Sequence, residues 1–173
     1  MIFHNVLYLY KLNKGGAIAM NDITIKVTTI EDISAIISFE KEARQTEPGV
    51  LYWDVDEKEY SAKLINLDID HLENSKIIIA KQNQKVIGRC DIAIILSLVN
   101  CEKIGYIDWI YMLKDYRNNG IDKKLLKGAE EYFKKNNVKS YFLETASNEE
   151  AQAFYQRQHD LQISQREIDK KKI

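Results

Sequence analysis

The stretch Asp115–Leu126, DYRNNGIDKKLL, joins a predicted strand to a predicted helix through a turn that contains one glycine, Gly120. The first backbone N–H groups of a helix have no partner inside the helix, and with the helix dipole they attract anions, phosphate above all. The junction alone is a weak signal, because many strand-turn-helix junctions carry a glycine and bind nothing. It is therefore a candidate anion site, with Asp122 adding a negative charge to the first turn.

Length and composition are those of an ordinary globular domain. The chain has 173 residues, of which 45% are hydrophobic and 29% charged, so we expect one domain or two at most. The formal net charge of −1 provides no basic field to recruit nucleic acid or anionic lipid. No apolar run approaches the roughly 18 to 20 residues that span a bilayer. We therefore expect a cytoplasmic protein without nucleic-acid or membrane partners.

The cysteines and histidines give no sign of a metal site. Cys90 and Cys101 are predicted to lie in neighbouring strands as free, buried thiols, outside any CxxC pair. The three histidines are scattered without the spacing of metal ligands. They are His4, His71 and His159.

The first 19 residues are interpreted as an N-terminal extension, and two hypotheses for it stay open, one of which is that it is not natural. Met20 is a candidate start, because Lys14–Gly16 could be encoded by a purine-rich ribosome-binding sequence upstream of it. The domain would then occupy residues 20–173. The alternative is an additional helix, Phe3–Leu12, that docks on the domain.

Periodicity predicts a strand and two helices in the first part of the chain. ITIKV, Ile23–Val27, alternates as a half-buried strand does, and Thr29 with Asp32 has the pattern of a helix capping box. The apolar face of this first helix is predicted to contain Ile33, Ile36 and Ile37. A second helix is predicted over Asp54–Asn74, beyond the loop with the only proline. Its inward residues are predicted to be Tyr60, Leu64 and Leu67.

The middle of the chain is predicted to be antiparallel sheet, with Gly88 at a bulge. Its strands are Lys76–Ala80, Lys85–Leu96 and Lys103–Leu113. A helix over Ile121–Lys135 follows. Its apolar stripe is Ile121, Leu125, Leu126, Ala129 and Phe133. The remaining predicted elements are a strand over Val138–Ala146, a helix over Asn148–Arg157 capped by Ser147 and Glu150, and a short strand in the tail.

From about Ile23 to Gln162 the chain resembles the GNAT superfamily of N-acetyltransferases. RNNGID, Arg117–Asp122, matches the first two fixed positions of the family signature Arg/Gln-x-x-Gly-x-Gly/Ala. TTIEDI, KVIG and NEEAQAFY, which ends at Tyr155, are also similar to family patterns. The resemblance implies an α/β (α+β) fold, with a central mixed, mostly antiparallel sheet flanked by helices and splayed between strands four and five.

The resemblance implies acetyl-CoA as cosubstrate, with the diphosphate held at the turn and the pantetheine arm between the splayed strands. The diphosphate donors would be the backbones of Arg117, Asn118, Asn119, Gly120, Ile121 and Asp122. The main chain of Ile110, Tyr111 and Met112 would flank the pantetheine, and one of these amides would hold the developing oxyanion. Asn148 would also contact the pantetheine, or else serve as an ordinary first-turn residue of its helix.

The reaction implied is direct transfer of acetyl from sulfur to a primary amine. An amine with a pKa near 10 must lose a proton before it attacks, and Asp108 matches an acidic position of the family. The alternative for Asp108 is a strand carboxylate that faces solvent or pairs with a lysine. Tyr155 is the candidate acid for the departing thiolate, and its alternative is packing beside Phe154.

Asp122 departs from the family pattern, which has glycine or alanine there. A carboxylate about 4 Å from the diphosphate would cost about 1 kcal/mol in water and about 4 kcal/mol at an effective dielectric of 20. The alternative is that Asp122 points to solvent or pairs with Lys123 or Arg117. Two functions therefore stay open: an acetyltransferase, and a catalytically impaired GNAT-fold binding or sensor module with a lost or altered CoA site.

The ends of the chain and its charged segments add weaker expectations. His159 and Asp160 stand where the family usually has a Gly-Phe pair. The short tail leaves room for only one further strand, so one edge of the sheet could be exposed and could pair with a second chain in a homodimer. The acidic, aromatic segment Glu40–Tyr60 points to a small cationic amine as acceptor. The lysines of the helix either attract the CoA 3′-phosphate or are simply solvated. They are Lys123, Lys124 and Lys127.

Overall fold

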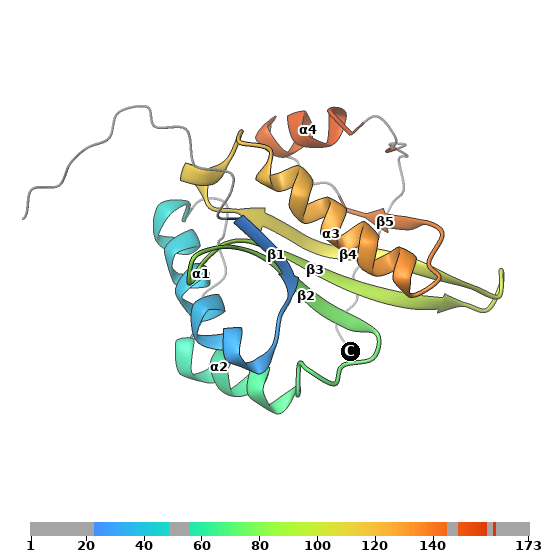
Figure 1. Ribbon diagram of the computed structural model, residues 1–173, viewed down its shortest axis with the longest axis horizontal. Coiled ribbons are helices and arrows are strands. Elements are labelled where there is room, and N and C mark those ends of the chain that lie inside the picture. The colour runs from blue at the N-terminus through green and yellow to red at the C-terminus, as the bar shows by residue number, and fades with distance from the viewer. Residues whose placement is uncertain (1–22, 49–55, 145–148, 159–160, 162–173) are drawn as a thin grey trace, which may run out of the picture.

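A mixed sheet in the order β1-β2-β3-β4-β5 runs through the part of the chain that the computed structural model describes, residues 23–48, 56–144, 149–158 and 161 (Figure 1). Pairing is antiparallel from β1 to β4, and β5 is parallel to β4. The strands are β1 Ile23–Val27, β2 Ser75–Gln82, β3 Lys85–Ser97, β4 Glu102–Met112 and β5 Tyr141–Leu143. The predicted fold class is confirmed.

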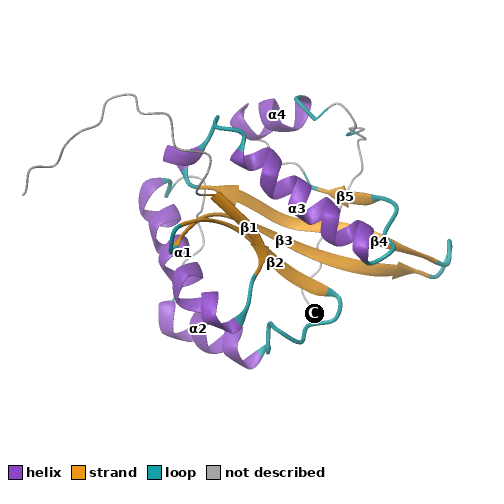
Figure 2. Ribbon diagram, in the orientation of Figure 1, coloured by secondary structure: helices purple, strands orange, loops and turns teal. Residues whose placement is uncertain are grey.

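Helices cover both faces of the sheet (Figure 2). They are the 3-10 turns η2 Ile30–Asp32 and η3 Lys114–Tyr116, and the helices α1 Ile33–Thr46, α2 Glu57–Asn66, α3 Ile121–Lys135 and α4 Glu149–Gln156. One core lies between the sheet and α1 with α2, around Phe39 and Ile79. The other lies between the sheet and α3, around Leu125 and Ile87, and Phe154 of α4 packs against it. Figure 1 shows α4 beside the N-terminal end of α3.

The start of α1 is fixed by Asp32. Its carboxylate accepts the backbone N–H of Thr29 at 3.1 Å, which completes the predicted capping box around η2, and the first turn then continues into α1. Lys26 of β1 and Lys81 of β2 donate to the same carboxylate at 2.7 and 2.9 Å. Burial works to raise the pKa of Asp32, but Lys26, Lys81 and the Thr29 N–H outweigh it and lower the pKa to about 2. Asp32 therefore ties α1 to two strands.

The second helix is shorter than predicted. Asp56 caps α2 by accepting the backbone N–H of Glu59 at 2.7 Å, and the helix ends at Asn66. Asp68 has φ +50°, outside helical geometry, so the helix cannot continue to Asn74. Leu64 is buried as predicted, but Leu67 is 55% exposed, and its predicted inward position is wrong.

Two irregularities shift the sheet register. Ala80 pairs with Gly88 while Lys81 pairs with Val86, so the predicted bulge lies next to Gly88. On β4, Asp91 pairs with Trp109 while Ile92 pairs with Ile107, which leaves Asp108 as an additional residue. This second bulge lets Ile107 and Met112, on either side of it, both face the α3 core.

α3 has the predicted bounds, and all five residues of its predicted stripe are buried. One of the two cysteine predictions is wrong: Cys90 is buried in β3, but Cys101 is exposed in the β3–β4 turn, where it takes φ +53°. No helix among the described residues is long and apolar enough to cross a membrane.

Several predictions fall outside the described residues. They concern residues 1–19, Asn148, the Ser147 cap, His159, Asp160 and the final strand.

Candidate functional site

The site lies along the part of β4 that extends past its described pairing with β5. The last β4–β5 pair is Ile107 with Leu143, whereas β4 continues to Met112. The bulge at Asp108 comes directly after this last pair. Ile110, Tyr111 and Met112, predicted to flank a pantetheine, therefore lie on the stretch of β4 beyond its described pairing with β5.

The turn after β4 presents the start of α3. Asn118 and Gly120 both take left-handed conformations, with φ +61° and +71°, and Ile121 begins the helix. Glycine adopts this conformation without steric cost, and asparagine tolerates it better than most residues. No side chain caps α3, and a Cβ built on Gly120 meets nothing within 4 Å. Space over this helix start and its uncapped N–H groups fit an anionic ligand.

Asp122 bonds to its own helix. Its Oδ1 accepts the backbone N–H of Lys123 at 2.9 Å, and the side chain is partly exposed. One donor of the first turn is thus used within the chain. The bond is to the backbone N–H of Lys123, so it is not the ion pair with the lysine side chain that the sequence left open.

The Arg117 side chain is directed at Glu47, which the sequence analysis did not single out. Arg117 Nη1 donates to Glu47 Oε1 at 3.1 Å, Nη2 donates to Oε2, and Nε donates to the Met112 carbonyl at 3.1 Å. The Tyr111 hydroxyl also donates to Glu47. Burial works to raise the pKa of Glu47, but Arg117 and Tyr111 outweigh it and lower the pKa. An anionic Glu47 therefore joins the end of α1 to β4 and the turn.

A buried ion cluster lies on the α1 and α2 side of β3 and β4, next to Tyr111. Arg89 is 5% exposed and donates to both Asp91 oxygens at 2.7 Å, to Glu40 at 2.8 Å and to the Tyr60 hydroxyl at 2.6 Å. Its guanidinium lies 5.4 Å from the ring centre of Trp109. Burial works to lower the pKa of Arg89, but the surrounding oxygens, Asp91 first, raise it. The guanidinium of Arg89 therefore stays charged, and its contacts connect β3 with α1, α2 and the Trp109 ring of β4.

Asp108, the predicted base, lies exposed at the bulge among other carboxylates. Tyr106 places its hydroxyl 3.5 Å from Glu144, at the end of β5. Burial raises the pKa of Tyr106 to about 12, with further contributions from Asp108 and Glu144. Burial also raises the pKa of Asp91, against the effect of Arg89, and Asp108 adds to the rise. Because Arg89 neutralises Asp91, the negative charge that favours a cation beside the bulge comes from the exposed carboxylates of Asp108 and Glu144.

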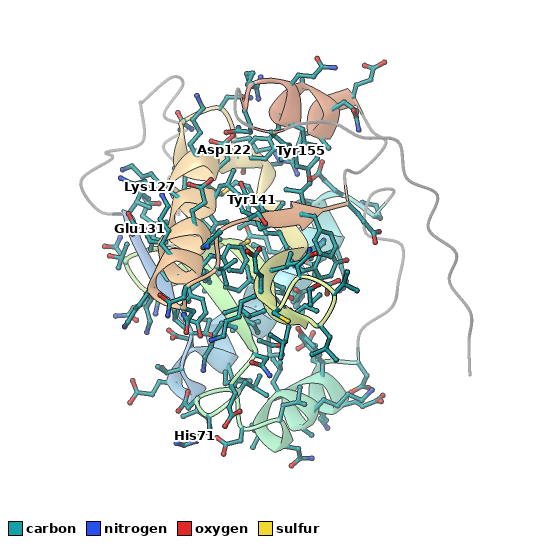
Figure 3. All side chains as sticks on the ribbon, turned by 90° about the vertical axis from the view of Figure 1, so that its right-hand side faces the viewer. His71, Asp122, Lys127, Glu131, Tyr141 and Tyr155 are labelled. Carbon is teal, nitrogen blue, oxygen red and sulfur yellow. The ribbon has the colours of Figure 1, made fainter. Side chains whose placement is uncertain are left out.

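Tyr155, the predicted acid, is 6% exposed and packs edge-on against Phe154, with ring centres 5.2 Å apart. Burial raises its pKa, so the phenol stays protonated at neutral pH. Figure 3 labels Tyr155 on α4 and Asp122 on α3 at the same end of the molecule. The hydroxyl could serve as a proton donor only to a sulfur held close to it.

A separate groove of about 430 Å³ lies between β1 and α3. Its lining includes Ile25 and Tyr132. It also includes Lys124 and Lys127, two of the three lysines considered for the CoA 3′-phosphate, but no residue of the turn at residues 117–122. Lys127 pairs with Glu131 at 3.7 Å on the exposed side of α3. The groove is thus distinct from the site at the end of β4.

Among the described residues, no three His, Cys, Asp or Glu side chains are grouped to hold a metal ion. The residues that sequence reasoning missed are Glu47, Arg89, Glu40, Tyr106 and Glu144. Each acts through a contact with a residue far away in sequence, and no local motif marks such a contact.

Comparison with known proteins identifies a family. A model described as the acetyltransferase (GNAT) family matches residues 36–160. No curated protein sequence matches the chain.

Similar solved structures share the fold at low sequence identity. An aminoglycoside acetyltransferase from an uncultured soil metagenomic sample, in complex with sisomicin, is 13% identical with a TM-score of 0.72, covering 88% of this chain and 97% of its own. Aminoglycoside N-acetyltransferase AAC(6′)-Iy in complex with CoA is 18% identical with a TM-score of 0.68, covering 87% and 94%. An integron cassette protein from the mobile metagenome of V. cholerae is 18% identical with a TM-score of 0.73, covering 87% and 93%.

Proposed function

Because the chain belongs to the acetyltransferase (GNAT) family, we propose that it is an acetyl-CoA-dependent N-acetyltransferase that transfers acetyl directly to a primary amine. The observation that carries the proposal is the turn at residues 117–122. It presents the start of α3, with Gly120 at φ +71°, after β4 and the short turn η3. A cytoplasmic location is part of the proposal.

In this proposal the turn holds the diphosphate through backbone N–H groups. The donors would be those of Arg117, Asn118, Asn119, Gly120, Ile121 and Asp122. Ile110, Tyr111 and Met112 would align the pantetheine arm, and Asn148 would contact it. Acetyl-CoA supplies the activated acetyl group. The fit rests on the open space over Gly120 and on a helix N-terminus whose N-cap residue, a glycine, has no side chain to occupy the N–H groups.

The chain's own residues would handle two protons. Asp108 accepts one from the acceptor ammonium, so that the amine nitrogen can attack the thioester carbonyl carbon. The C–N bond forms, the nitrogen releases its second proton to solvent, and the C–S bond breaks, so the net reaction releases one proton. The thiolate then takes a proton from Tyr155, and a backbone N–H of Ile110–Met112 stabilises negative charge on the carbonyl oxygen. Transfer of a proton from Asp108 to Tyr155 through solvent restores both groups.

The acceptor we propose is a small cationic amine. Asp108 and Glu144 place negative charge around Tyr106 beside the bulge, and this charge would draw a cation. Two of the similar structures are named aminoglycoside acetyltransferases, and one of them is a complex with sisomicin. We also propose that a second chain pairs with the β5 edge to form a homodimer.

The experiment is a screen of amines with acetyl-CoA, in which release of the free thiol is followed and the product is identified by mass spectrometry. We expect thiol release that depends on both the protein and a cationic amine, and a product heavier by one acetyl group. Absence of transfer to polyamines, aminoglycosides, amino-acid amines and peptide N-termini would contradict the proposed activity.

A second candidate function is a catalytically impaired binding or sensor module. The observation that favours it is Asp122, whose carboxylate occupies the Lys123 N–H at 2.9 Å in the first turn of α3. If this charge disables the site, Asp122→Gly restores CoA affinity. Equally weak CoA binding by Asp122→Gly and the unchanged protein would exclude repulsion as the cause.

A further inference from the structure

Glu47 lies at a junction that no part of the proposed reaction uses. It is the C-terminal cap of α1, and its side chain is only 11% exposed. Both carboxylate oxygens accept hydrogen bonds from the β4 side, Oε1 from Arg117 and Oε2 from Arg117 and Tyr111. A carboxylate bonded in this way on both oxygens is fixed in orientation, and its bonds are stronger than neutral ones.

Arg117 connects Glu47 to the turn at residues 117–122. Its Nε donates to the Met112 carbonyl at 3.1 Å, and its guanidinium lies 5.3 Å from the ring centre of Tyr111. Asn119 closes the turn from the other side, because its Nδ2 donates to the Arg117 carbonyl at 3.1 Å. The side chain of Arg117 is thus held by Glu47 and β4, and its carbonyl is held by Asn119.

The turn has a special backbone conformation that these contacts help to hold. Arg117 is extended, with φ −70° and ψ 164°, and Asn118 next to it takes φ +61°. A left-handed residue other than glycine has a steric cost and persists where its surroundings hold it. The contacts that hold Arg117 therefore favour the conformation in which the following N–H groups converge at the start of α3.

We propose that Glu47 is a positioning residue that holds Arg117, and through it the turn at residues 117–122, in the conformation that binds the diphosphate of acetyl-CoA. The inference rests on the proposed function. Glu47 does not touch the ligand, so its effect is on affinity for the CoA moiety and not on the chemical step. The long range of the contact, 70 residues in sequence, explains why no motif contains it.

The test is calorimetric titration of CoA into Glu47→Gln, which keeps the size of the side chain and removes its charge. We expect the Kd to rise about tenfold, because charge-assisted bonds are replaced by neutral ones. In the transfer assay, the KM for acetyl-CoA rises while kcat at saturation is unchanged. Tyr111→Phe removes one bond to Glu47 and keeps the ring, so we expect a smaller rise in Kd, and this variant serves if Glu47→Gln does not fold.

Two control variants separate positioning from general damage. Asp32→Asn weakens an anchor of α1 in a different part of the fold, and Glu57→Gln removes an exposed pair with Lys41 at 2.8 Å. Both should keep the CoA affinity of the unchanged protein. Equal losses in Asp32→Asn and Glu47→Gln, or no loss in Glu47→Gln, would overturn the inference. Failure of the unchanged protein to bind CoA would instead overturn the proposed function, and this inference with it.

Discussion

Replacing Asp32 by asparagine removes the charge that joins α1 to β1 and β2. Asp32 is 2% exposed, and its carboxylate pairs with Lys26 at 2.7 Å and with Lys81 at 2.9 Å. Asparagine keeps the size of the side chain and can still accept the Thr29 N–H, so the substitution isolates the ion pairs. Two lysine ammonium groups would be left without this partner, which adds to the cost.

The magnitude follows from the pKa. Asp32 has a pKa of about 2 in the folded protein, against an ordinary value of 3.8. At about 1.4 kcal/mol per pKa unit, this shift contributes about 2 kcal/mol to the free energy of unfolding at pH 7. Because the folded pKa is depressed, the contribution is fully present above pH 4. It is lost as the pH falls towards 2.

The assay is urea unfolding of the unchanged protein and Asp32→Asn between pH 7 and pH 2.5. We expect the variant to be less stable by about 2 kcal/mol at pH 7, with the difference shrinking steadily below pH 4. Glu131→Gln, which removes an exposed pair at 3.7 Å, is the control and should change stability by less than about 0.5 kcal/mol. A difference that stays constant down to pH 2.5 would refute the argument, since the charge of Asp32 would then not be its source.

Three further predictions concern the proposed site. Gly120→Ala forces a side chain into φ +71° and should lower stability by about 1 kcal/mol in urea unfolding and weaken CoA binding in calorimetry; unchanged values for both would contradict the role of the turn. Asp108→Asn should lower kcat/KM about 100-fold in the transfer assay with the Kd for CoA unchanged, as removal of a general base does. Tyr155→Phe keeps the packing against Phe154 and should lower kcat with little change in melting temperature, whereas full activity would make Tyr155 a core residue only.

Local patterns predicted the parts of the fold that local energetics decide. The 3.6-residue period of α3 gave its bounds and all five buried residues, because one apolar stripe faces one sheet. The Thr29–Asp32 capping box was likewise visible in four consecutive residues. Leu67 was placed wrongly because α2 ends there, immediately before the left-handed Asp68, and Cys101 because it takes a left-handed turn conformation itself. No hydrophobic pattern marks either turn.

For the candidate site, the sequence predicted the backbone motif of the turn but not the side-chain contacts around it. Arg117–Asp122 was recognised as a motif, and the structure places it at the end of β4 with Gly120 left-handed. The bulge at Asp108 was not predicted, since a bulge is defined by the partner strand and β3 is distant in sequence. Glu47 and Arg89 were missed for the same reason: a buried ion pair depends on which charges the fold brings together.

The central claim is that the turn at residues 117–122 binds acetyl-CoA. Calorimetric titration of the unchanged protein with acetyl-CoA, at low and at moderate salt, tests it most directly. The account predicts saturable one-to-one binding that weakens as salt rises, because the diphosphate is an anion. Absence of heat together with absence of thermal stabilisation at millimolar acetyl-CoA would contradict it.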